Sequence, residues 1–65
     1  MHISYKRLWK LLIDKELKKK DLARMAGISQ SSITKLTNNE NVTTDILVKI
    51  CLALECGISD IADIV

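Results

Sequence analysis

Apolar residues recur along this sequence at the three- and four-residue spacing of amphipathic helices. The first stripe falls at positions 5, 8, 9, 12 and 13, and a later one at positions 46, 47, 50, 51 and 54. No segment shows the strict alternation of a half-buried strand, and the chain has no proline. The pattern therefore predicts an all-α fold of five short helices, over residues 4–16, 19–26, about 30–38, about 44–55 and 60–65.

Glycine and hydroxyl residues mark the boundaries of the expected helices. Gly27 follows the second helix, where a left-handed residue commonly ends a helix. Ser29 is placed to cap the third helix, and Ser4, Thr43 and Ser59 would cap the first, fourth and fifth. Residues 21–36 thus combine a helix, a glycine turn and a second helix, and the rest of the chain is organised around them.

The third predicted helix has two contrasting faces. Ile33 and Leu36 form its apolar stripe, which we expect to face the core. The opposite face carries small or extended hydrogen-bonding groups, of the kind that reach base edges in a DNA groove. These residues are Gln30, Ser31, Thr34 and Lys35.

Charge is divided unevenly along the chain. Residues 1–39 hold nine of the ten Lys and Arg residues against three acids, a net +6, while residues 40–65 carry −4. Such a basic region is typical of proteins that bind polyanions, although ordinary charge imbalance is common in small proteins. Lys18, Lys19 and Lys20 also gather at the start of the second helix, where a bound phosphate would relieve their repulsion; a merely solvated lysine run is the alternative.

Size and composition narrow the function further. The 65 residues suffice for one small domain, 1–65, and Trp9 is expected to anchor its thin core. The sequence has no phosphate-binding glycine loop, nucleophile motif or carboxylate pair, so we expect neither an enzyme nor a cofactor. His2 is alone, which argues against a metal site. The longest apolar run, residues 50–54, is far shorter than the ~20 residues that span a bilayer.

The two cysteines are predicted to be free thiols. Cys51 and Cys56 are five residues apart. On one continuous helix, this spacing would place them about 140° apart around the axis, an unfavourable geometry for a disulfide. We expect a reducing cytoplasm and a core position for Cys51.

Taken in order, the motifs resemble those of the phage-repressor and Cro-type helix-turn-helix family, also called the xenobiotic-response-element (XRE) family. The resemblance covers nearly the whole chain and is closest to the short bacterial members that consist of this domain alone. It implies a lambda-repressor-like fold with the helix-turn-helix at about residues 19–37. The matching residues are Leu22-Ala23, Ala26-Gly27-Ile28-Ser29, Ile33, Leu36, Leu47, Ile50, Ala53-Leu54 and Ile58-Ser59-Asp60-Ile61.

The resemblance also implies how the chain would contact DNA. The third helix would enter the major groove, with Gln30, Ser31, Thr34 and Lys35 toward the bases, while the second helix lies across the backbone. The DNA-backbone contacts implied by position are Lys19, Lys20, Ser32, Asn38, Asn39 and Asn41.

The sequence departs from the family at four positions. Leu12 and Thr37 stand where the family often pairs an arginine with a glutamate, and losing both partners avoids an orphaned charge. Asn39 replaces the usual glycine after the third helix and still tolerates left-handed geometry. Glu40 places a negative charge where the family approaches phosphate, so it either points away or weakens affinity.

These observations predict a sequence-specific DNA-binding transcriptional regulator, a repressor that acts as a homodimer in the bacterial cytoplasm. One alternative is an antitoxin that represses its own operon, and another is a protein-interaction module that has lost DNA binding. The dimer surface would involve the end of the chain and Leu52, which lies off the core stripe. The residues proposed for it are Leu52, Ile61, Ile64 and Val65.

Overall fold

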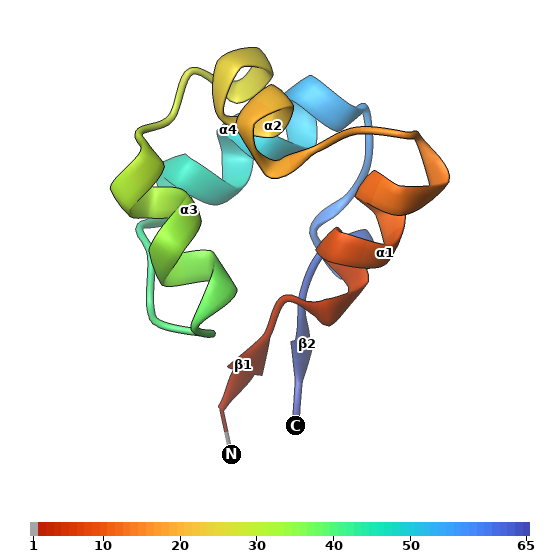
Figure 1. The fold of residues 1–65 in the computed structure, drawn as a ribbon. Helices are drawn as coiled ribbons and strands as arrows, with labels where there is room; N and C mark the ends of the chain where they lie inside the picture. The colour runs from red at the N-terminus through yellow and green to blue at the C-terminus, as the bar shows by residue number, and fades with distance from the viewer. Residues whose placement is uncertain (1) are drawn as a thin grey trace.

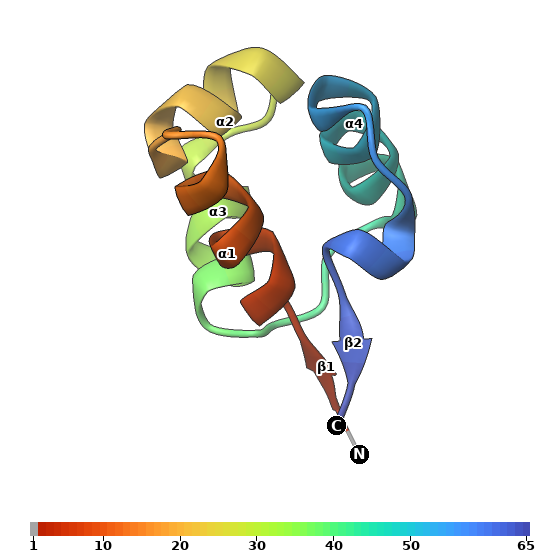
Figure 2. The same ribbon diagram turned by 90° about the vertical axis from the view of Figure 1, so that its right-hand side faces the viewer.

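The computed structural model describes residues 2–65, and in this range the chain forms four α-helices and a two-stranded antiparallel sheet (Figure 1). A 3-10 turn at Ile58–Asp60 follows the last helix. The helices form the body of the domain, and the paired strands project from it as a short ribbon (Figures 1 and 2). The elements are β1 (Ile3–Ser4), α1 (Lys6–Asp14), α2 (Lys19–Ala26), α3 (Gln30–Thr37), α4 (Thr44–Leu54) and β2 (Asp63–Ile64).

The predicted fifth helix is wrong. After the 3-10 turn the chain extends and pairs with β1, in the register Ile3 with Ile64 and Ser4 with Asp63. Ser59 lies inside the 3-10 turn, and the carboxylate of Asp60 accepts a 2.9 Å hydrogen bond from the Gly57 N–H instead. Strands of two residues are too short for an alternating pattern, so the sequence carried no signal for this ribbon.

The first helix begins later than predicted. Ser4 belongs to β1, and α1 starts at Lys6. The side-chain oxygen of Asn39 accepts a 3.1 Å hydrogen bond from the Tyr5 N–H. The start of α1 is therefore fixed by a residue 34 positions away, in the loop that follows α3.

The core is built by all four helices together with the C-terminal segment. Ile13, expected on the inner stripe of α1, is 73% exposed, whereas Ile61, expected on a dimer surface, is fully buried. Ile61 therefore belongs to the core and cannot contact a partner. Trp9 and Cys51 are half-buried and pack against the core. The buried side chains are Tyr5, Leu8, Leu12, Leu22, Ile28, Ile33, Leu36, Ile50, Leu54 and Ile61.

Each of the four helices ends in the same kind of turn. One residue adopts a left-handed conformation, and the amide of the next residue bonds to the carbonyl five positions before it, which is the Schellman motif. The left-handed residues are Glu16, Gly27, Asn39 and Glu55. The corresponding N–H to O=C bonds are Leu17 to Leu12 (2.8 Å), Ile28 to Ala23 (3.0 Å), Glu40 to Lys35 (2.8 Å) and Cys56 to Cys51 (3.0 Å).

The turn after α4 overturns the helical argument about the two cysteines. Cys51 lies on α4, but Glu55 has a φ of 54°, so the chain reverses before it reaches Cys56. The angular separation expected for one continuous helix does not apply to this pair. Both cysteines are free thiols and both are half-buried.

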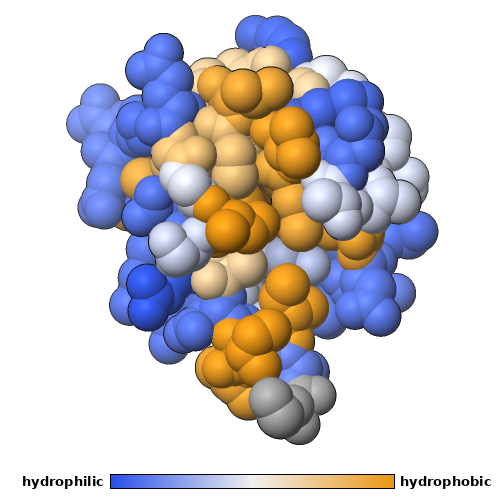
Figure 3. All heavy atoms as spheres, turned by 180° about the vertical axis from the view of Figure 1, so that it is seen from behind, coloured by the Kyte–Doolittle hydropathy of each residue, from blue (hydrophilic) through white to orange (hydrophobic). Residues whose placement is uncertain are grey.

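Apolar side chains also remain on the surface. Seen from behind, apolar atoms gather along the middle of one face and near the chain ends (Figure 3). Within residues 2–65, no helix has the length and apolar character needed to cross a bilayer. The large exposed apolar side chains are Ile13, Met25, Val48, Leu52, Ile58, Ile64 and Val65.

Candidate nucleic-acid interface

The turn between α2 and α3 has the geometry that the sequence predicted. Gly27 ends α2 with a φ of 68°, a conformation that glycine adopts without a Cβ penalty. Ile28 is buried below the turn, and the Ser29 hydroxyl caps α3 by accepting a 3.3 Å hydrogen bond from the Ser32 N–H. Because α2 also packs on α3 and α4, the angle between the two helices is fixed from several sides.

Two buried residues set which face of α3 meets solvent. Ile33 and Leu36 are 1% and 0% exposed and hold the helix against the core. The opposite face is open to solvent and carries the four residues expected to read bases. These are Gln30, Ser31, Thr34 and Lys35, all of them exposed.

Within this group the short side chains are engaged by α3 itself. The Ser31 and Ser32 hydroxyls lie 3.0 and 3.2 Å from the Ser29 hydroxyl. Thr34 donates a 3.1 Å hydrogen bond to the carbonyl of Gln30, so its hydroxyl hydrogen is committed to the backbone. Gln30 and Lys35 are the long side chains of this face, and they have the greatest reach into solvent.

Lys19 lies in a contact that joins three helices. Its ammonium donates a 3.0 Å hydrogen bond to the Thr37 hydroxyl at the end of α3 and lies 4.5 Å from the centroid of the Trp9 ring on α1. Thr37 in turn donates a 2.9 Å hydrogen bond to the Ile33 carbonyl. An ammonium has three donors, so this arrangement holds Lys19 in place and leaves donors for a phosphate.

The sequence identified Lys19 but not the two residues that position it. The sequence pattern predicts a core position for Trp9 and marks Thr37 only as a departure from the family. Their partnership with Lys19 spans α1, α2 and α3, so no local spacing could have revealed it. We call this contact the Lys19 clasp, formed by Trp9, Lys19 and Thr37.

The start of α2 is less repulsive than its lysines suggest. The carboxylate of Asp21 accepts a 3.0 Å hydrogen bond from the Lys18 N–H, which stabilises the first turn. Asp21 also lies 3.9 Å from the guanidinium of Arg24. Lys18, Lys19 and Lys20 are all exposed, so their charges remain available to an anion at this end of α2.

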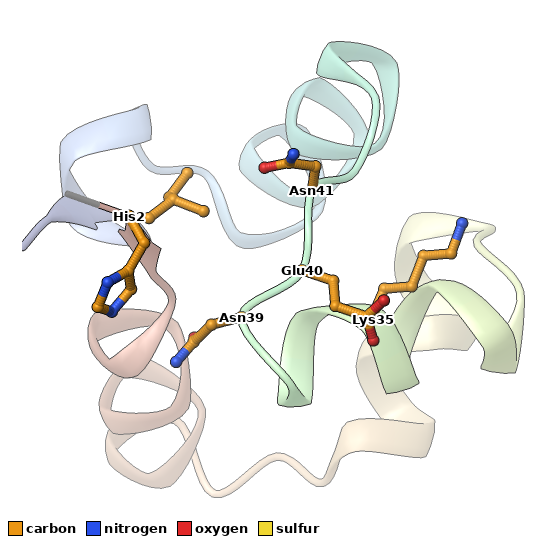
Figure 4. A pocket seen from close by; sticks show the side chains of 6 residues that line it. His2, Lys35, Asn39, Glu40 and Asn41 are labelled. Carbon is orange, nitrogen blue, oxygen red and sulfur yellow. The ribbon is translucent and has the colours of Figure 1, made fainter.

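The asparagine-rich loop after α3 borders an open cleft of about 590 Å³ between the loop and β1 (Figure 4). Asn38 and Asn41 are exposed. Asn39 is partly committed, because its side-chain oxygen holds the start of α1. The residues that border the cleft are His2, Ile3, Lys35, Asn39, Glu40 and Asn41.

Glu40 borders the same cleft as Lys35. The turn that ends α3 bonds the Glu40 N–H to the Lys35 carbonyl, which brings the two residues to one side of the helix end. The Glu40 carboxylate also accepts a 3.3 Å hydrogen bond from the Asn38 amide. A negative charge therefore lies among the groups that were expected to approach DNA.

Potential metal ligands are scattered in the described part of the chain. Among residues 2–65, no three His, Cys, Asp or Glu side chains are placed to hold a metal ion. Burial raises the pKa of the Tyr5 hydroxyl above its ordinary value, in keeping with a neutral core position. The polar groups of α2, α3 and the following loop form the candidate nucleic-acid interface.

Comparison with known proteins agrees with this geometry. The family model of the Cro/C1-type helix-turn-helix DNA-binding domain matches residues 7–65. The crystal structure of the transcriptional regulator VanUg, Form II, is similar to the chain with a TM-score of 0.91 and 45% sequence identity; the alignment covers 95% of this chain and 83% of that one. No curated protein sequence matches the chain significantly.

Proposed function

The chain belongs to the Cro/C1-type helix-turn-helix DNA-binding family, and we propose that it is a sequence-specific transcriptional repressor that binds DNA as a homodimer. The transcriptional regulator VanUg, which it resembles, supports a role in gene regulation. The observation that carries the proposal is the exposed face of α3, where buried Ile33 and Leu36 fix the orientation of Gln30 and Lys35.

In this proposal α3 lies in the major groove and its long side chains read the bases. Gln30 is suited to a bidentate contact with adenine, and Lys35 to the acceptors of guanine or to a phosphate. Ser31 and Thr34 contribute less, because the Ser31 hydroxyl already bonds to the Ser29 cap and the Thr34 hydroxyl to the Gln30 carbonyl. Repression follows from occupation of a promoter-proximal site and requires no chemical reaction.

The experiment that tests base reading compares a double variant with the parent. We expect Gln30→Ala with Lys35→Ala to remain folded, because both side chains are exposed, and to lose about 2–5 kcal/mol of specific binding. Binding to a selected DNA pool, sequenced after selection, measures affinity and base preference together. Unchanged affinity and preference would show that α3 does not read the sequence.

The proposal assigns Lys19 to a phosphate rather than to a base. Lys19→Ala is expected to weaken binding equally on all sequences and to lower the slope of log K against log salt by about 1. Thr37→Val provides a control that retains the charge but removes the hydroxyl that Lys19 contacts. It should cause a smaller loss of affinity and leave the salt slope unchanged. A changed base preference in Lys19→Ala would contradict the assignment.

Removing the charge of Glu40 is expected to raise DNA affinity, whereas the other variants lower it. If the α3–α4 loop approaches phosphate, Glu40→Gln removes repulsion and raises affinity severalfold at low salt, with less effect at high salt. Glu55→Gln removes the same charge from the end of α4 and serves as the matched control. Equal effects from both variants would mean that only net charge matters and that the loop is not near the DNA.

Homodimer formation is proposed because one small domain makes few phosphate contacts and two recognition helices can span a palindromic site. The surface proposed for it combines Leu52, which is 73% exposed on α4, with Ile64 and Val65 of the C-terminal segment. Leu52→Glu should shift the protein toward monomer in sedimentation experiments. Ile13, also 73% exposed, offers a matched control: Ile13→Glu should leave the dimer unchanged. The reverse result would place the interface on α1.

A further inference from the structure

The turn after α4 places the two cysteines of the chain at the two ends of one hydrogen bond. The Cys56 N–H donates to the Cys51 carbonyl over 3.0 Å, while Glu55 supplies the left-handed residue between them. In this motif the side chains of the first and last residues of the bond commonly touch. Sequence separation on a helix would keep these thiols apart, and the turn instead brings them together.

At two other helix ends the equivalent residues border a common space. At the end of α1 the equivalent residues, Leu12 and Leu17, line one apolar groove. At the end of α3 the equivalent residues, Lys35 and Glu40, line one cleft. The turn after α4 likewise brings Cys51 and Cys56 to one side of the chain.

Backbone dimensions make a bridge between the two cysteines feasible. A carbonyl-to-amide bond of 3.0 Å limits the separation of the two Cα atoms to roughly 7 Å, and the bend at each end makes it shorter. Disulfides span Cα separations of about 4.4–6.8 Å. The bridge would thus form across the existing turn, with only local adjustment of the side chains.

We propose that Cys51 and Cys56 form a dithiol modification site, at which a low-molecular-weight disulfide oxidises the pair to an intramolecular disulfide. The Cys51 thiolate attacks one sulfur of the small disulfide and releases one thiolate, leaving a mixed disulfide on Cys51. The Cys56 thiolate then attacks the Cys51 sulfur and releases the second small thiolate. Two electrons and two thiol protons leave the protein, and the small disulfide becomes two thiols.

The surroundings of Cys56 favour this order of attack. Burial, first, and the neighbouring Cys51 thiol, second, raise the pKa of Cys56 above its ordinary value, while the charge of Lys15 opposes the shift. A thiol with a raised pKa holds little thiolate at neutral pH. Cys56 is accordingly the second, resolving thiol, which reacts once Cys51 presents a disulfide directly beside it.

The experiment equilibrates the full chain with mixtures of reduced and oxidised glutathione, quenches with acid and separates the products by mass. Intramolecular disulfide, mixed disulfide and dithiol are then counted under native conditions and in concentrated urea. If the folded turn holds the thiols together, the effective concentration of one thiol at the other is about tenfold higher in the native chain. By linkage, the oxidised protein must also melt at a higher temperature than the reduced protein.

The matched control moves one thiol by two positions. Cys51→Ser combined with Lys49→Cys keeps two thiols in the same short stretch, but places one at an exposed site on a different side of α4. This variant should form mixed disulfides and show no native advantage over urea, with circular dichroism checking that it is folded. Cys51→Ser alone should accumulate only the mixed disulfide on Cys56. Equal effective concentrations in native and unfolded parent chains, or an advantage shared by the shifted pair, would overturn the proposal.

Discussion

The ends of α2 and α4 use the same backbone turn with very different residues. At the end of α2, Gly27 takes the left-handed position and the next residue, Ile28, is buried in the core. At the end of α4, Glu55 takes that position with a φ of 54°, and the next residue, Cys56, is half-buried. One turn is specified by its own sequence, whereas the other forms against the preference of its residue.

The difference shows which of the two turns depends on the surrounding core. A left-handed conformation costs a residue with a Cβ atom about 1–2 kcal/mol, so the turn after α4 requires help from its surroundings. That help comes from Leu54 before the turn and Ile61 after it, both buried in the core. The turn of the helix-turn-helix needs no such support at Gly27. It sets the angle of α3, the helix proposed to read DNA.

The largest expected effect is on the free energy of unfolding, when the residues that follow the two turns are truncated. Ile28→Ala removes a buried side chain and should lower the free energy of unfolding by about 2–4 kcal/mol, whereas Cys56→Ala should lower it by about 1 kcal/mol or less. Urea unfolding followed by circular dichroism measures both. Equal losses would mean that the two turns are anchored to the core to the same degree.

The next largest effect is expected from a substitution at Gly27, the left-handed residue of the helix-turn-helix. A Cβ atom at Gly27 would meet nothing within 4 Å, so Gly27→Ala should cost only the backbone strain, about 1 kcal/mol. The variant should keep its base preference, because the turn retains its geometry. An altered preference, measured on a selected DNA pool, would show that the methyl group changes the angle between α2 and α3.

The reverse substitution should improve the other turn. Glu55→Gly relieves the left-handed strain but loosens the unfolded chain, for a net gain of about 0.5–1 kcal/mol. Glu16→Gly, at the equivalent position after α1, should give a similar gain and serves as an internal check. A loss of stability in both variants, measured by thermal unfolding, would mean that these glutamates make contacts that outweigh their strain.

The last comparison concerns the turn after α3, where a glycine is expected to be nearly neutral and an alanine is not. Asn39 tolerates a φ of 56° better than glutamate does, and its side-chain oxygen also accepts a hydrogen bond from the Tyr5 N–H. Asn39→Gly relieves strain but loses that hydrogen bond, so stability should change by less than about 0.5 kcal/mol. Asn39→Ala loses the bond and keeps the strain, and should cost about 1–2 kcal/mol more. Equal stabilities of the two variants would mean that strain at this position is negligible.

The sequence predicted the central part of the fold because local signals determine it. Gly27, the capping hydroxyls of Ser29 and Thr43, and the apolar stripes gave the four helices nearly their observed bounds. Glu55 does not indicate a turn, since glutamate ordinarily continues a helix. For the same reason, the separation expected for Cys51 and Cys56 on one helix was wrong, although both are free thiols as predicted.

The candidate site could be predicted only where it depends on one helix. The four exposed residues of α3 follow from its periodicity, and the structure places them on its solvent face. The Lys19 clasp depends on contacts among three helices, and the bond from Tyr5 to Asn39 joins residues 34 positions apart. Ile61 was misplaced because an apolar residue near a chain end looks the same whether it faces the core or a partner.

The terminal ribbon has a mechanical consequence for the whole domain. His2 and Val65 exchange two backbone hydrogen bonds, of 2.8 and 2.9 Å, so these two residues lie side by side at the tip of the ribbon. Bonds between antiparallel strands run perpendicular to the strands. A force applied between the two ends therefore loads the His2–Val65 pair first and then opens the ribbon one pair at a time, like a zipper. The ribbon yields before the helical body bears tension, and the domain resists pulling at its ends far less than it would resist shear between its helices.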